Sequence, residues 1–180
     1  VGGLGVDSIK NIRLLNKNKL EEKLKLKFLK KSILVTYHPE TLNKKISQNN
    51  FKHLINALKK LKDTTIIFTM PNSDMESSLI IRLIKNFTRL NKNSFLFKSL
   101  GQKNYYACCN QVNCMIGNSS SGLLEMPSFK KFSINIGNRQ KGRTKATSVI
   151  DCKPNSNEIL KYLNFVFKES SQKKLKYTTN

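Results

Sequence analysis

The chain has few of the features that mark membrane, disulfide-rich or zinc-binding proteins. Its 180 residues include no Trp, four Cys and two His, and no stretch approaches the roughly 18 to 20 apolar residues that a membrane span requires. No two Cys have the Cys-x-x-Cys spacing typical of zinc sites. The start, Val1 to Leu4, lacks the basic and apolar regions of a secretory signal and indicates a truncated chain. We therefore expect a cytoplasmic protein with free thiols, no membrane contact and no bound metal.

Acidic residues are scarce: 11 of them face 33 Lys and Arg, which gives a net charge of +22. Such a balance is typical of proteins that bind nucleic acids. However, the lysines are scattered among many asparagines, and no basic stripe interleaved with aromatic residues is present. We interpret most of the charge as compositional bias and expect no specific nucleic-acid partner, with non-specific binding of polyanions at low salt. A basic, non-enzymatic binding domain is kept as one alternative.

Short apolar runs alternate with segments in which apolar residues recur at helical spacing. The runs predict strands at residues 32–36, 65–69, 94–97, 114–117 and 132–136, and helices lie between and after them. Residues 17–31 are expected to form one amphipathic helix with Leu20, Leu24 and Phe28 facing inward. This alternation predicts an α/β fold, a Rossmann-like parallel sheet with helices on both faces.

Polar or distinctive residues follow the predicted strands one after another. His38 follows the first strand, Asn72 the second, Leu100 the third, Ser119 the fourth and Arg139 the fifth. Ligands of such sheets bind beyond the carboxyl ends of the strands. These residues are therefore expected to line one edge of the sheet.

The segment after the fourth strand is the strongest indication of a ligand. Gly117-Asn118-Ser119-Ser120-Ser121-Gly122 leads from a strand into a predicted helix that carries Glu125. A helix start offers unpaired N–H groups, serines add donors and glycine allows close approach, which together suit a phosphate. A carboxylate at Glu125 suits sugar hydroxyls instead. Serines at this place are more often only helix caps, so the turn alone is weak evidence.

The motifs resemble the hydrolysing UDP-N-acetylglucosamine 2-epimerases of sialic-acid-type sugar biosynthesis. The resemblance rests on residues 117–125, on Pro127-Ser128-Phe129 and on residues 135–143, which read Asn-Ile-Gly-Asn-Arg-Gln-Lys-Gly-Arg. Residues 36–41 match the His-Pro element of that family and residues 70–74 its Pro-Asn element. These motifs occur in the family's order, so the match is specific.

The resemblance implies a glycosyltransferase-B-like fold in which the C-terminal half binds UDP. A length of 180 residues fits one such half. Residues 1–16 would be the interdomain hinge and connecting helix, 17–170 the UDP-binding domain and 171–180 a tail. The absent N-terminal domain would supply the catalytic carboxylates, and a homo-oligomer is left open.

The resemblance also implies roles for the predicted site residues. His38 would contact the diphosphate and assist proton transfer, Leu100 would lie against the uracil, and Glu125 would bind the ribose. The remaining nucleotide contacts would be Asn72, Ser119, Ser120 and Arg139. Without the resemblance, His38 could cap a strand end, Asn72 form a turn, Leu100 belong to the core and Arg139 be a solvated cation.

The implied reaction eliminates UDP from a UDP-N-acetylhexosamine and hydrates the resulting glycal, with no cofactor. A UDP-sugar-dependent glycosyltransferase of the same fold is the other alternative. The chain departs from the family at one turn: relatives continue with Gly, an aliphatic residue and Pro where this chain has Lys130-Lys131-Phe132-Ser133. The geometry of that turn is therefore an open question for the sequence.

Overall fold

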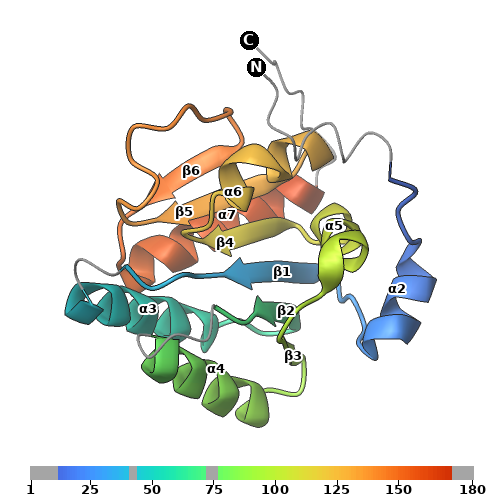
Figure 1. Cartoon of the computed structure of the whole chain (residues 1–180), viewed down its shortest axis with the longest axis horizontal. Helices are drawn as coiled ribbons and strands as arrows, with labels where there is room; N and C mark the ends of the chain where they lie inside the picture. Colours follow the sequence, from blue (N-terminus) through green and yellow to red (C-terminus); the bar gives the residue numbers. More distant parts are fainter. Residues whose placement is uncertain (1–11, 41–43, 72–76, 172–180) are drawn as a thin grey trace.

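The computed structural model describes residues 12–40, 44–71 and 77–171. Its centre is a six-stranded, fully parallel sheet with the strand order β3-β2-β1-β4-β5-β6 (Figure 1). The strands are β1 (Lys31–Thr36), β2 (Thr64–Thr69), β3 (Ser94–Phe97), β4 (Cys114–Gly117), β5 (Phe132–Ile136) and β6 (Val149–Cys152). The helices are α2 (Lys17–Leu24), α3 (Lys44–Leu58), α4 (Ser78–Leu90), α5 (Gly101–Gln111), α6 (Ser121–Leu124), the 3-10 helix η3 (Met126–Phe129) and α7 (Ser156–Ser171).

Alternating residues of the central strands supply two separate apolar cores, one on each face of the sheet. In β1, Ile33 and Val35 pack with the buried side chains of α3, α4 and α7, whereas Leu34 packs with those of α2, α5 and η3. Strands covered on both faces are expected to read as continuous apolar runs, as these do. The predicted fold class is confirmed.

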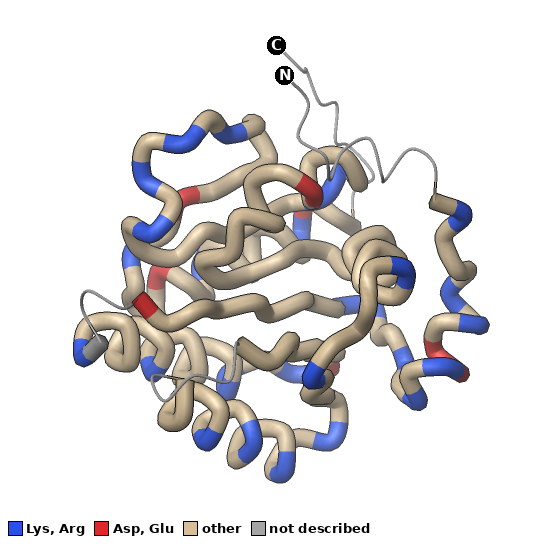
Figure 2. The backbone as a smooth tube through the Cα atoms, in the orientation of Figure 1, with Lys and Arg blue, Asp and Glu red and all other residues tan. Residues whose placement is uncertain are grey.

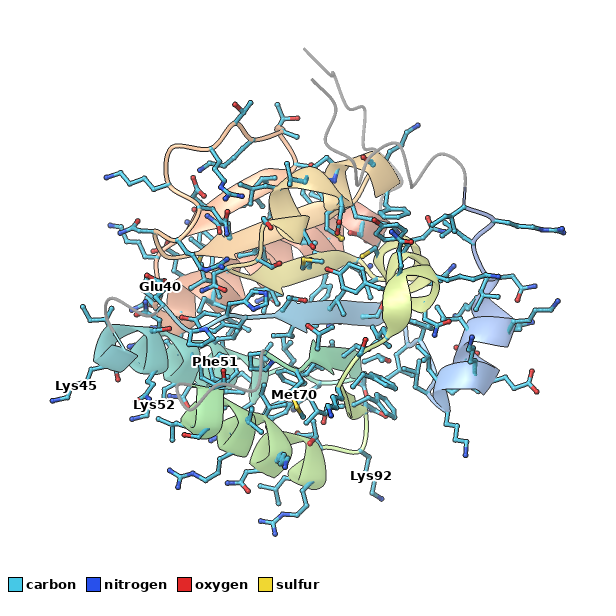
Figure 3. The ribbon with its side chains drawn as sticks, viewed as in Figure 1. Glu40, Lys45, Phe51, Lys52, Met70 and Lys92 are labelled. Atoms are coloured by element: carbon cyan, nitrogen blue, oxygen red, sulfur yellow. The ribbon has the colours of Figure 1, made fainter. Side chains whose placement is uncertain are left out.

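Helix α3 shows how the helical pattern separates core from solvent. Phe51 is fully buried between α3 and the sheet, where its ring lies 5.0 Å from that of Tyr37. Lys45 and Lys52 extend away from the sheet on the outer side of the same helix (Figure 3). The apolar stripe of this helix therefore covers β1 and β2, and its charges stay in water.

Two local predictions are wrong or incomplete. The helix expected over residues 17–31 ends at Leu24, because Lys25 adopts a left-handed conformation (φ 53°, ψ 44°) and its N–H bonds the Glu21 and Glu22 carbonyls. Phe28 is buried, but it lies in an irregular segment. Its N–H donates to Glu21 Oε1 at 2.7 Å. Strand β6 was not predicted, since only Cys152 in it is buried. Residues 12–16, the described part of the expected hinge, have no regular structure.

Positive charge is spread over the molecule. Figure 2 shows Lys and Arg on α2, α3 and α4 and on the loop from β5 to β6, with few acidic residues between them. In the described part of the chain, no helix combines the length and apolarity needed to cross a membrane. Within that same part, no group of three His, Cys, Asp or Glu side chains is arranged to hold a metal ion.

Candidate functional site

A cavity of about 450 Å³ lies at the carboxyl edge of the sheet, above the adjacent ends of β1 and β4. In this strand order the chain leaves β1 toward β2 on one side and returns at β4 on the other, so the loops diverge there (Figure 1). Such a switch point is where doubly wound sheets bind ligands. The cavity is lined by Thr36, His38, Thr69, Lys98, Ser99, Leu100, Gly101, Gln102, Tyr105, Tyr106, Ser119, Ser121 and Glu125.

Gly117 brings the ends of β1 and β4 together beneath this cavity. It has a φ of +147°, and a Cβ there would lie 1.9 Å from the backbone oxygen of Thr36. No other residue type fits that space, because the contact is with backbone and the conformation is one that L side chains rarely adopt. The close approach places the β4–α6 turn directly beside the β1 loop.

The β4–α6 turn, residues 117–122, leaves donors unpaired. Ser119 is 9% exposed, and its Oγ accepts the Ser121 N–H at 3.3 Å. The N–H groups of Ser119 and Ser120 have no partner among the residues that the structure describes. Ser119 and Ser121 line the cavity, whereas Ser120 is not among the lining residues. The turn therefore offers hydroxyl and main-chain donors to an anion.

The helix after this turn is shorter than predicted. α6 has only four residues, and the chain continues as the 3-10 helix η3. Pro127 explains the break, because it has no N–H to donate to the carbonyl of Leu123. A single turn has a small dipole, so the binding capacity of this segment resides in its individual N–H and O–H groups.

Glu125 stands at the junction between α6 and η3 and reaches the cavity wall. Its Oε2 atom is buried and has no hydrogen-bond partner within the described ranges. Tyr105 and Tyr106 of α5 line the same wall. Burial raises the pKa of Tyr105 well above its usual range, so its hydroxyl stays protonated and can donate. The carboxylate is available to accept hydrogen bonds from hydroxyl groups of a ligand.

His38 lies half-buried in the cavity wall, one residue before Pro39. Burial, and to a lesser extent the positive charge of Arg139, lowers the pKa of the imidazole below its ordinary value. The ring is therefore neutral at pH 7 in the free chain. Its main chain is held by Asn118, whose Oδ1 accepts the His38 N–H at 2.7 Å.

Arg139 is exposed and lies beside the cavity instead of in its wall. Its Nη1 donates to the Asn118 carbonyl at 3.1 Å, and Gln140 Nε2 donates to the same oxygen at 2.8 Å. Leu100 does line the cavity; it is 7% exposed and its carbonyl accepts a bond from Asn104 Nδ2 at 2.8 Å. Asn72 lies outside the described residues.

Sequence reasoning missed Asn118, Gln140 and Tyr105. Asn118 and Gln140 are 0% and 2% exposed, respectively. Both are polar residues inside the motifs already singled out, and buried polar side chains require hydrogen-bond partners. That requirement was the signal that could have identified them.

A family model described as UDP-N-acetylglucosamine 2-epimerase matches residues 1–180, and the chain belongs to this family. It is 42% identical over 156 residues to the "GDP/UDP-N,N'-diacetylbacillosamine 2-epimerase (hydrolyzing)" of Campylobacter jejuni, covering 86% of this chain and 41% of that protein. It is 38% identical over 165 residues to "Polysialic acid biosynthesis protein P7" of Escherichia coli, covering 91% and 42%. The chain thus spans about two fifths of the length of these curated relatives.

Solved structures agree on the fold. The S. aureus MnaA–UDP co-structure superposes with a TM-score of 0.67 at 16% identity, covering 99% of this chain and 49% of that one. The C-terminal domain of a group 1 glycosyltransferase, LpcC of Francisella tularensis, gives a TM-score of 0.57 at 16% identity, covering 91% and 88%. At these identities the likeness shows the fold alone, and it confirms the glycosyltransferase-B-like architecture.

Proposed function

We propose that this chain is the UDP-binding, C-terminal half of a hydrolysing UDP-sugar 2-epimerase that acts on a UDP-N-acetylhexosamine. The observation that carries the proposal is the convergence of His38, Leu100, Ser119 and Glu125, from the three segments that follow β1, β3 and β4, on one cavity at the switch point. The C. jejuni relative is named as hydrolyzing, which supports the hydrolysing branch of the family. The chain spans about two fifths of that relative, which supports the proposal that this is one half of a longer protein. The proposed division is 1–16 hinge, 17–170 UDP-binding domain and 171–180 tail.

The diphosphate would bind at the β4–α6 turn. The unpaired N–H groups of Ser119 and Ser120 and the hydroxyls of Ser119 and Ser121 all belong to this turn. Hydrogen bonds to a charged group contribute roughly 1.5 to 3 kcal/mol each. Ser120 would therefore act through its main chain, and His38 would complete the anion site from the β1 side.

The nucleoside would extend from the turn toward α5. Glu125 would accept hydrogen bonds from the ribose hydroxyls through the unpartnered Oε2. Leu100 would pack against the uracil, with the edge of the base reaching main-chain groups of the β3–α5 loop, since the Leu100 carbonyl is already engaged. Asn72 and Arg139 are proposed as the remaining nucleotide contacts.

The reaction would remove the C2 proton of the sugar while the C1–O bond breaks and its electron pair leaves with UDP. The glycal formed would then add water across C1 and C2, which gives UDP and the free 2-epimer. Donors that stand ready at the diphosphate stabilise the charge that develops on the leaving group, which is the task of Ser119, Ser121 and His38. The groups that move the C2 proton would come from the N-terminal half, because Glu125 is the only carboxylate among the described residues that line the cavity.

Calorimetric titration of the chain with UDP, and with GDP as the comparison, tests the proposal. We expect saturable UDP binding, weaker GDP binding and no turnover of UDP-N-acetylglucosamine by this chain alone. Absence of UDP binding would contradict the assignment of the cavity. Sustained release of UDP and free sugar by the isolated chain would place the acid–base groups in this half. In the complete protein, an epimerase releases a free sugar without an acceptor, whereas a glycosyltransferase requires one.

A further inference from the structure

Asn118 occupies the point where three loops of the site meet. It is 0% exposed and follows Gly117 at the end of β4. Its N–H donates to the Thr36 carbonyl of β1 at 3.2 Å, and its own carbonyl accepts the two side-chain bonds from Arg139 and Gln140 of the β5 loop. One residue therefore joins the loops that follow β1, β4 and β5.

The side chain of Asn118 binds both main-chain groups of His38. Oδ1 accepts the His38 N–H at 2.7 Å, and Nδ2 donates to the His38 carbonyl at 2.8 Å. A carboxamide offers an acceptor and donors together, whereas a carboxylate has no donor and an alkyl side chain has neither. Pro39 restricts the backbone of His38 as well, because the residue before a proline is confined to extended conformations. The main chain of His38 is thus fixed from two directions.

We propose that Asn118 is a positioning residue that holds His38 in the cavity wall, facing the departing diphosphate, with Gln140 and Arg139 bracing it from the β5 side. The proposal rests on the proposed function, because the diphosphate gives His38 its task. Asn118 acts through His38, since it is not itself among the residues that line the cavity.

The test compares Asn118→Ala with Asn135→Ala in the full 180-residue chain. Asn135 is a matched control: it is 3% exposed, stands near the carboxyl end of β5 and bonds Asp151 Oδ1 at 2.8 Å instead of His38. Two quantities are measured, the affinity for UDP by calorimetry and the titration of the His38 ring by NMR. His53, the other histidine of the chain, is the internal reference. Urea unfolding establishes that each variant is folded.

We expect Asn118→Ala to bind UDP at least about tenfold more weakly, because the loop that carries His38 loses two hydrogen bonds. The His38 pKa should also rise toward about 6.5 as the ring becomes more exposed. Asn135→Ala should match the wild type in both measurements. The proposal is overturned if Asn118→Ala retains the affinity and the His38 titration of the control.

Gln140→Ala provides a second variant. It leaves the Asn118 side chain in place and removes one of the two hydrogen bonds to the Asn118 main-chain carbonyl. We expect about a threefold loss of UDP affinity, since one neutral hydrogen bond is lost. If Asn118→Ala does not fold, this variant decides: unchanged affinity and unchanged His38 titration overturn the proposal. If the wild-type chain fails to bind UDP, the proposed function falls, and the His38 titration of the unliganded variants alone decides whether Asn118 positions the ring.

Discussion

Two turns flank the short helical segment of the site, and they differ in whether their backbone N–H groups are hydrogen-bonded. In the β4–α6 turn, Gly117 sits at a φ of +147° against the Thr36 carbonyl, and two serine N–H groups lack partners within the described chain. In the η3–β5 turn, residues 129–132, Lys130 adopts φ 54° and ψ 43° and its N–H bonds the Met126 and Pro127 carbonyls. The first turn therefore has backbone donors without partners in the described chain, whereas the Lys130 N–H of the second turn is bonded to carbonyls of η3.

The difference separates the turn that we propose binds the diphosphate from a turn that only redirects the chain. Unpaired donors at a buried edge are unfavourable for folding and are retained where a ligand can bind them. The second turn also answers the question raised by the missing family glycine. Lys130 takes the left-handed conformation that glycine adopts at helix ends, and Ser133 after it pairs in register with Met115. With Lys130 in place of that glycine, the turn still leads into β5 in parallel register with β4.

The strongest way to break this comparison is to place a side chain at Gly117. Gly117→Ala is expected to lower the free energy of unfolding by on the order of 3 kcal/mol or more, because its Cβ would overlap the Thr36 oxygen in a strained conformation. Gly142→Ala is the control: its φ is +84°, but nothing lies within 4 Å of a Cβ there. It should lose only about 1 to 2 kcal/mol. Urea unfolding of both variants measures the difference, and equal losses would show that the contact with Thr36 relaxes easily.

The sequence predicted the elements that have an unbroken apolar run or a clear helical stripe. Strands β3, β4 and β5 were predicted with their observed limits, and β1 and β2 each begin one residue earlier than predicted. β6 escaped detection because its burial is mostly partial, with only Cys152 inside. Helix α2 ends at Leu24 because Lys25 adopts a left-handed conformation. A lysine in the sequence does not predict that conformation. Local pattern therefore predicted five of the six strands, and the left-handed conformation of Lys25 determined where α2 ends.

The hydroxyls of the β4–α6 turn give the next largest expected effect. Replacing Ser119 and Ser121 together by Ala should weaken UDP binding at least about tenfold, since each lost bond to a charged group is worth roughly 1.5 to 3 kcal/mol. Ser120→Ala is the matched control, because Ser120 is not among the lining residues and caps α6 without a side-chain hydrogen bond. Calorimetry measures all three chains. A loss in Ser120→Ala as large as in the double variant would mean that the cavity wall is assigned to the wrong serines.

The pH dependence of UDP binding distinguishes the contribution of His38 from that of the β4–α6 turn. The His38 pKa is lowered in the free chain, and a bound diphosphate would raise it, so binding would take up a proton. Affinity should therefore increase by about threefold to tenfold between pH 8 and pH 6 and level off below the free-state pKa. The phosphate of UDP also titrates near pH 6, with the opposite effect on affinity. The informative quantity is thus the difference between the wild type and His38→Gln, and identical pH profiles would remove the imidazole from the anion site.

The sequence predicted several residues of the candidate site, but it did not predict the hydrogen bonds that join them. The strand-end positions of His38, Leu100 and Ser119 followed from the order of motifs, and the structure brings these three to one cavity. The bonds from Asn118 to His38 join residues 80 positions apart in sequence, which no local pattern reveals. Arg139 stood in a predicted motif, but its bond to the Asn118 carbonyl depends on the pairing of β4 with β5.

The smallest expected effect tests the second turn. Lys130→Gly should raise the free energy of unfolding by about 0.5 to 1 kcal/mol, because glycine adopts the left-handed conformation without the steric penalty of a Cβ. Lys25→Gly should behave alike, since Lys25 has nearly the same conformation at the end of α2. Lys92→Gly is the control, because Lys92 is exposed in a turn with a negative φ and gains only chain entropy in the unfolded state. Urea unfolding measures the three variants, and UDP affinity should be unchanged in Lys130→Gly. If that substitution alters UDP binding instead of stability, the two turns are not separate, and the η3–β5 turn takes part in shaping the cavity.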